Sequence, residues 1–242
     1  MSIEDHRWAN NYLTTTGGVI HALRVRAYYK EVIQPALITL DAQIEAWKGN
    51  PDGGAPFVED DARQLRRATI EAFCLAIQSI WERQLRGYLQ TCDPLGRSGI
   101  DFHLATWNDL QEAFSRLRGI RMDAFDSFPV LDLLQLVGNA CRHGDGPAAR
   151  ALFDRRPEFW PIWEKLIEAT WAMPEGGEPL VGPAPFGMVE FPAAFLQQAT
   201  EAIAWFWKDV EYIYLASIAR PTPEVPRLME EMREERRKRQ RM

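Results

Sequence analysis

The stretch from residue 60 to residue 90 constrains the fold most, because apolar residues recur along it at helical spacing. One side of this helix is predicted to carry an apolar stripe and the other a charged surface. The stripe consists of Leu65, Ala68, Ala72, Leu75, Ile80, Leu85 and Leu89. At about 1.5 Å per residue the helix would span about 45 Å, so it needs neighbours along its length. We therefore expect an elongated, all-α helical bundle.

Further helices follow from the same periodicity and from the turn-forming residues between them. They are predicted over residues 19–47, 107–118, 128–143 and 193–217, with one or two short ones within 147–173. Pro35 should kink the first of these, and Thr106 with Asp109 resembles a helix cap. Residues 174–192 are rich in Pro and Gly, which favours a long irregular loop. The prediction is a bundle of about five to seven helices.

One domain is expected over residues 1–220, followed by a Pro-containing linker and a basic tail over 221–242. Residues 236–242 carry five positive charges and none negative, although the whole chain has a net charge of −6. Residues 228–241 could form a helix with Glu before Arg, although that helix would lack an apolar face. For residues 236–241 the alternatives are contact with RNA or an acidic partner and a solvated, disordered end, and we favour disorder because nothing apolar anchors them. The acidic remainder of the chain argues against extended, nonspecific binding of nucleic acid duplexes, but leaves room for a small RNA site.

Composition and spacing exclude several classes of protein. No segment approaches the run of about 18 apolar residues that a membrane span requires. Residues 1–6 lack the basic start and apolar run of a signal peptide. The three cysteines, Cys74, Cys92 and Cys141, fit no metal-ligand spacing. The sequence therefore predicts a cytoplasmic protein without a metal or organic cofactor.

Other chemistry-bearing residues have simpler interpretations. Glu71 and Glu82 lie on the long helix without an accompanying Glu-x-x-His pair, so ion-paired surface positions are expected for them rather than a di-metal centre. His21 and His103 are isolated, and no metal is assigned to them. The aromatic residues 205–207 could stack on bases, but packing in the core is the favoured interpretation.

The helix end at Asn139–His143 is the most informative segment for function. Asp132, Gln135, Asn139, Arg142 and His143 fall along one stripe of the predicted helix. Free carbonyl groups at a helix C-terminus favour a protonated imidazole, which suits His143 for proton transfer. The neighbouring arginine offers a fixed positive charge for a phosphate. A His before a Gly at a helix end is, however, a common arrangement without any chemical role, and composition and spacing alone favour that interpretation.

Gly138 interrupts this helix at a cost of roughly 1 kcal/mol relative to Ala. One reason to tolerate that cost is the close approach of another helix or of a ligand.

The segment Asn139-Ala140-Cys141-Arg142-His143-Gly144 resembles the motif helix of the HEPN superfamily, small helical-bundle proteins of bacterial defence, toxin–antitoxin and RNA-processing systems. The family motif places an Arg four to six residues before a His, often with an Asn directly after the Arg. His143 matches the His and Asn139 the Asn. No arginine occupies the expected positions, which hold Leu136, Val137 and Gly138.

The resemblance implies a metal-independent ribonuclease that acts as a homodimer, with RNA as substrate and a protein antitoxin as a further partner. His143 would transfer protons, Arg142 would take the place of the missing arginine, and Asn139 would assist. The alternative is a non-catalytic protein-interaction or dimerisation module. The enzyme requires His143 and Arg142 to open onto a cleft shared between two copies. The interaction module predicts an apolar surface near Gly138 or near the aromatic residues 205–207.

Overall fold

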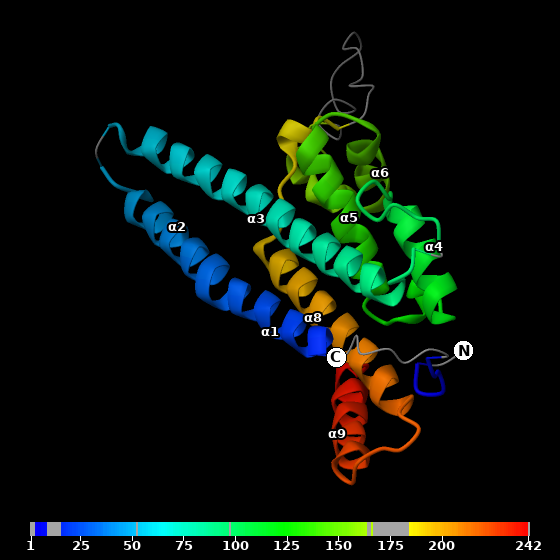
Figure 1. Ribbon diagram of the computed structural model, residues 1–242. Helices are drawn as coiled ribbons and strands as arrows, with labels where there is room; N and C mark the ends of the chain where they lie inside the picture. The colour runs from blue at the N-terminus through cyan, green and yellow to red at the C-terminus, as the bar shows by residue number, and fades with distance from the viewer. Residues whose placement is uncertain are drawn as a thin grey trace. The chain divides into compact units, whose positions relative to one another are not determined.

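The computed structural model describes residues 3–8, 16–51, 53–96, 98–163, 166 and 184–241. Within this part of the chain there are eight α-helices and no β-strand, so the predicted all-α helical bundle is confirmed (Figure 1). The helices are α1 (Thr16–Tyr28), α2 (Gln34–Trp47), α3 (Ala55–Cys92), α4 (Trp107–Arg118), α5 (Phe128–His143), α6 (Pro147–Arg155), α8 (Ala193–Ala216) and α9 (Glu224–Arg239). In the described residues, no helix combines the length and apolar character that crossing a bilayer requires.

Several predicted helix ends are confirmed by their capping geometry. The Thr106 hydroxyl accepts from the Asp109 N–H, and the Asp109 carboxylate accepts from the Thr106 N–H, which forms a capping box at the start of α4. α4 ends at Gly119, with φ of 68°, and α5 ends at Gly144, with φ of 61°. Both glycines adopt the left-handed conformation that terminates helices.

Pro35 divides the first predicted helix, as expected. The π-helical turn Tyr29–Ile33 lies between α1 and α2, and the Gln34 N–H bonds to the carbonyl of Tyr29, five residues back. A proline has no N–H to donate, and its ring collides with the carbonyl four residues earlier in a regular α-helix. The wider π turn accommodates the proline while the chain stays helical.

The residues group into two compact units, each assembled from segments that are distant in sequence. Unit 1 comprises Met1–Ala27, Ile80–Leu131 and Thr200–Met242. Unit 2 comprises Tyr28–Ser79 and Asp132–Ala199.

Unit 1 has an aromatic core. Five fully buried rings meet there: Trp81, Phe114, Phe125, Phe206 and Trp207. The Trp207 indole N–H donates to Oε1 of Gln84 at 2.7 Å, so the polar atom of this buried ring is satisfied. Core packing is thereby confirmed for Phe206 and Trp207.

The C-terminal segment of unit 1 differs from the prediction. Residues 224–239 form α9, which runs beside the second half of α8, so a helix is present where one was considered and the disorder favoured for residues 236–241 is wrong over 236–239 (Figure 1). Arg239 pairs with Asp209 of α8, and Arg236 pairs with Asp126. The sequence offered no extended apolar face for anchoring, but ion pairs and a few half-buried apolar side chains hold the helix in place.

In unit 2, α2 and the first half of α3 run side by side in opposite directions (Figure 1). One face of this hairpin is buried, and its α2 side consists of Leu37, Leu40 and Ile44. Arg66 of α3 pairs with Asp41 of α2 across the hairpin.

The predicted apolar stripe of α3 does not form a single buried face. Leu65 is 55% exposed, and Ala68 and Ala72 are exposed as well, whereas Leu85 and Leu89 are fully buried. The steps from residue 75 to 80 and from 80 to 85 are five residues long, and each turns the stripe by about 140° around the helix. The buried face in unit 2 consists instead of Ile70, Cys74 and Ile77.

A second aromatic cluster orders part of the predicted irregular loop. Residues 184–192 contain the short 3₁₀ helix Phe186–Met188, and Phe191 packs edge-on against Phe159 at 5.5 Å between ring centres. The Trp160 indole donates to the Pro185 carbonyl at 2.8 Å. The remainder of the predicted loop, residues 174–183, lies outside the described residues.

Candidate functional site

The candidate site is the C-terminal half of α5, in unit 2. Leu134, Val137 and Ala140 on this helix are fully buried, and they fix which way its polar stripe faces. The Gly144 N–H closes the last turn by donating to the Ala140 carbonyl at 2.8 Å. Asn139 is half-buried, whereas Arg142 and His143 are exposed.

At Gly138, α5 lies in close contact with Gln78 of α3. A Cβ atom at this position would lie 2.6 Å from Cγ of Gln78 and 2.9 Å from its Cβ. Carbon atoms in ordinary contact are about 3.5–4.0 Å apart, so no side chain fits at position 138 without moving α3. The expected close approach of another helix is therefore confirmed, and it accounts for a glycine within α5.

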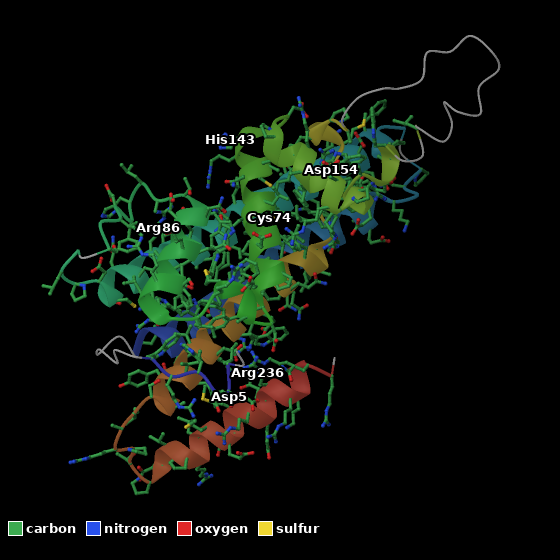
Figure 2. The ribbon with its side chains drawn as sticks, turned by 90° about the vertical axis from the view of Figure 1, so that its right-hand side faces the viewer. Asp5, Cys74, Arg86, His143, Asp154 and Arg236 are labelled. Atoms are coloured by element: carbon green, nitrogen blue, oxygen red, sulfur yellow. The ribbon has the colours of Figure 1, made fainter. Side chains whose placement is uncertain are left out.

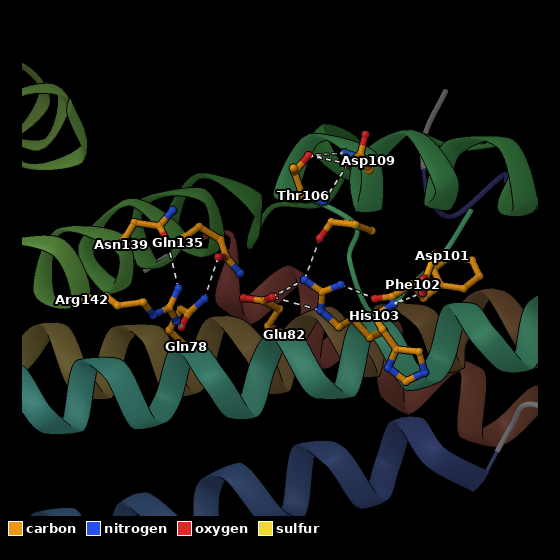
Figure 3. Close-up of polar contacts among 12 residues, drawn as sticks. Gln78, Glu82, Asp101, Phe102, His103, Thr106, Asp109, Gln135, Asn139 and Arg142 are labelled. Carbon is orange, nitrogen blue, oxygen red and sulfur yellow. Dashed lines mark hydrogen bonds and ion pairs between the residues drawn. The ribbon is translucent and has the colours of Figure 1, made fainter. Parts of the chain in front are cut away.

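A hydrogen-bonded network spreads from the same contact (Figure 3). The side-chain amide of buried Gln78 donates to Oε1 of buried Gln135 at 2.9 Å. Arg142 donates from Nη2 to Oε1 of Gln78 at 3.0 Å, and from Nη1 to Oδ1 of Asn139 at 3.4 Å. Two of the predicted site residues, Asn139 and Arg142, are thus brought together as parts of the α3–α5 contact.

The charge of Arg142 is not neutralised within the described part of the chain. Its guanidinium contacts two amide oxygens, of Gln78 and Asn139, and pairs with no described carboxylate. Amide oxygens orient the guanidinium but leave its full positive charge in place. Because the residue is exposed, this charge is accessible to an anion.

His143 occupies the last position of α5, at its exposed end (Figure 2). Its ring forms no hydrogen bond or ion pair with the described residues. The carboxylate of Asp145, two residues further along the chain, accepts the Phe186 N–H at 2.6 Å. The turn after α5 brings Asp145 to the segment 184–192, which needs a partner for its backbone.

The remaining member of the predicted stripe forms an ion pair with a different helix. Asp132 pairs with Arg155 at 2.7 Å and so ties α5 to α6. The five stripe residues therefore contribute to a helix–helix contact with α3, to an ion pair with α6 and to an exposed helix end.

Two buried or half-buried arginines in unit 1 were not singled out by sequence reasoning. Arg86 binds Glu82 and donates to the carbonyls of Phe102 and Ala105, which fixes the segment leading into α4 (Figure 3). Arg118 lies 4.9 Å from the ring centres of both Trp8 and Tyr88. The (i, i+4) spacing of Glu82 and Arg86 could have revealed the first, whereas nothing local signals the second.

Glu71 and Glu82 are ion-paired, with Arg67 and Arg86, as the sequence predicts. Among the described residues, no three His, Cys, Asp or Glu side chains cluster closely enough to hold a metal ion. Burial raises the pKa of the Cys74 thiol well above its usual range, and that of Cys141 to about 12. A thiol that stays protonated is a poor nucleophile.

No protein-family model, curated protein or solved structure matches this chain.

Proposed function

We propose that this protein is a non-catalytic, HEPN-like helical module that self-associates, with the motif helix α5 serving as a structural element. The observation that carries this proposal is an exposed apolar stripe on the first half of α3, formed by Phe57, Val58, Leu65, Ala68 and Ala72, with half-buried Leu75 at its end. Phe57 is 76% exposed and Leu65 is 55% exposed. Several exposed apolar side chains on one helix face are more informative than any one of them alone.

The spacing of this stripe is that of a helix-pairing surface. Positions 58, 65 and 72 hold Val, Leu and Ala at steps of seven, and the intermediate positions 61, 68 and 75 hold Asp, Ala and Leu. Heptad spacing keeps a seam facing a partner helix, and small residues let two backbones approach closely. A second copy of the same helix presents a matching seam, so we favour a homodimer.

The helix end at Asn139–His143 supports the same proposal, because two of its polar side chains are already hydrogen-bonded within the protein. Arg142 and Asn139 are bonded to each other, and Arg142 also bonds to Gln78 of α3. The position best suited to a catalytic arginine is Gly138, where Gln78 leaves no room for a side chain. The interaction module was expected to have an apolar surface near Gly138 or near residues 205–207. The exposed apolar stripe that we propose for this role lies on α3 instead.

Light scattering coupled to gel filtration tests the proposal. We expect the wild-type protein to be a dimer and Leu65→Asp to be a monomer with unchanged helical content. Leu104→Asp is the matched control, because Leu104 is 82% exposed and is not a member of the stripe. A wild-type protein that stays monomeric at all concentrations, or equal effects of the two substitutions, would overturn the proposal.

A second candidate, the metal-independent ribonuclease, is favoured by one specific observation. The unneutralised guanidinium of Arg142 lies one residue from the exposed imidazole of His143. In such a reaction the ribose 2′-oxygen attacks the adjacent phosphorus, His143 takes the hydroxyl proton, and the arginine stabilises the charge on the phosphate. The 5′-oxygen of the next nucleotide leaves and takes up a proton.

Cleavage of a labelled RNA and growth on expression distinguish the two candidates. The enzyme predicts activity that His143→Ala abolishes and that His103→Ala, at another exposed histidine, leaves unchanged. Absence of cleavage and of toxicity in the wild-type protein would eliminate this second candidate.

A further inference from the structure

The face of α9 that contacts the rest of unit 1 changes from apolar to positively charged along the helix. Its members Val225, Met229, Met232, Arg236 and Arg239 recur at steps of four and three residues, which places them on one side. The first three are half-buried apolar side chains, Arg236 is buried, and Arg239 is half-buried. Arginines therefore occupy the positions where a docked helix usually continues with apolar residues.

On the opposing surface, carboxylates form ion pairs with these arginines. Arg239 donates to Oδ1 of Asp209 at 2.8 Å, and Arg236 donates to Oδ2 of Asp126 at 3.1 Å. Asp209 is almost completely buried, and burial raises the pKa of its carboxyl group. Lys208 beside it pairs with Glu235 of α9.

Aromatic rings complete the arginine-binding surface. The guanidinium carbon of Arg239 lies 5.5 Å from the ring centre of Trp205, and that of Arg233 lies 5.6 Å from the ring centre of Tyr212. The Arg233 Nε–H also donates to the Tyr212 hydroxyl at 3.0 Å. Carboxylates combined with ring faces recognise arginine rather than cations in general, because the planar guanidinium can both stack and donate in a fork.

The contact between α9 and this surface leaves hydrogen-bonding capacity unfilled. Nε and Nη1 of Arg236, Nε of Arg239 and Oδ2 of Asp209 are buried without a hydrogen-bond partner among the described residues. Removing charged groups from water costs free energy that incomplete pairing does not fully offset. An ionic, incompletely bonded helix of this kind is therefore easier to displace than one held by a continuous apolar face.

We propose that Trp205, Asp209, Tyr212 and Asp126 form a binding surface for an arginine-rich amphipathic helix of a partner protein, and that α9 occupies it as a displaceable cover. The partner helix would carry arginines three and four residues apart, as α9 does. Because α9 competes from within the same chain, the apparent affinity for the partner is reduced by the small fraction of molecules in which α9 is released.

The test uses the full chain and a fluorescent peptide of residues 222–241 as the probe. The double variant Arg236→Glu/Arg239→Glu should release its own α9 and bind the peptide saturably, at least about tenfold more tightly than the wild type does. Adding Asp209→Asn to the double variant should abolish this binding. Equal binding by wild type and double variant, or no binding by either, would overturn the proposal.

Two controls separate a specific surface from general charge attraction and from misfolding. A peptide of the same composition in scrambled order should bind weakly, and equal binding would count against recognition of a helical arginine pattern. Circular dichroism checks that the double variant is folded. If the double variant is not folded, hydrogen exchange on the wild-type protein takes its place. The amides of α9 should then exchange faster than those of residues 200–210, and faster still at high salt. An exchange rate of α9 that does not depend on salt would refute displacement.

Discussion

Replacing Gly138 with alanine should destabilise the protein, although alanine is the better helix former. The new Cβ would lie 2.6 Å from Cγ of Gln78, about 1 Å closer than an ordinary carbon–carbon contact. Gln78 cannot easily give way, because it is fully buried and bonded to Gln135 and Arg142. The collision therefore pushes α3 and α5 apart or breaks this network.

The expected size of the effect follows from opposing contributions. Overpacking of a tight contact costs about 1–3 kcal/mol, and each disrupted hydrogen bond adds about 1 kcal/mol. The gain from replacing a helical glycine is about 1 kcal/mol. We expect a net loss of about 2 kcal/mol, which lowers the melting temperature by roughly 4–8 °C in a protein of this size.

Thermal and denaturant unfolding measure this loss, and Gly87→Ala is the matched control. Gly87 is also a helical glycine, in α3, but a Cβ there would meet no atom within 4 Å. That variant should be more stable than the wild type by up to about 1 kcal/mol. In a Gln78→Ala background, Gly138→Ala should cost less than in the wild type. If Gly138→Ala proves as stable as Gly87→Ala, the packing explanation for the glycine at position 138 is wrong.

Three further predictions rest on single residues. Burial raises the pKa of Glu211 to about 7, so the folded chain holds this proton more tightly than the unfolded chain, and stability falls as the pH rises from about 4.5 to about 7. Glu211→Gln should therefore be more stable at pH 8, by about 1–2 kcal/mol after allowance for its partial exposure, and exposed Glu31→Gln should not be. Thr106→Ala removes the cap of α4 and should cost about 1 kcal/mol in chemical unfolding, an effect whose absence would show that the capping box is dispensable. Cys141, whose pKa burial raises to about 12, should react slowly with iodoacetamide at pH 8 in the native protein and quickly after unfolding.

Local sequence signals predicted the helices well and their packing less well. The bounds of α4 and α5 follow from caps and glycines that act within one turn, so they can be read from neighbouring residues. The buried face of α3 could not be read in this way, because two steps of five residues carry the apolar pattern around the helix. Which part of that pattern is covered depends on segments far away in sequence.

The candidate site shows the same division. Spacing placed Asn139 and Arg142 on one stripe, and the structure joins them. The partner that joins α5 to α3 is Gln78, which lies 61 residues before Asn139 and has no local feature to mark it. The order of the tail was missed for a related reason, since Asp209 and Asp126 stabilise α9 from other elements.

The division of the chain into interleaved segments has a practical consequence for fragment experiments. Unit 1 is assembled from three segments and unit 2 from two, and each boundary falls within a helix or at its last residue. No single cut of the gene therefore yields either unit intact, and a deletion series from either end would remove parts of both before it isolated one. Binding regions mapped by truncation would appear scattered along the whole sequence even if the true surface were one patch on α3 or α8, so point substitutions in the complete chain are the appropriate way to locate it.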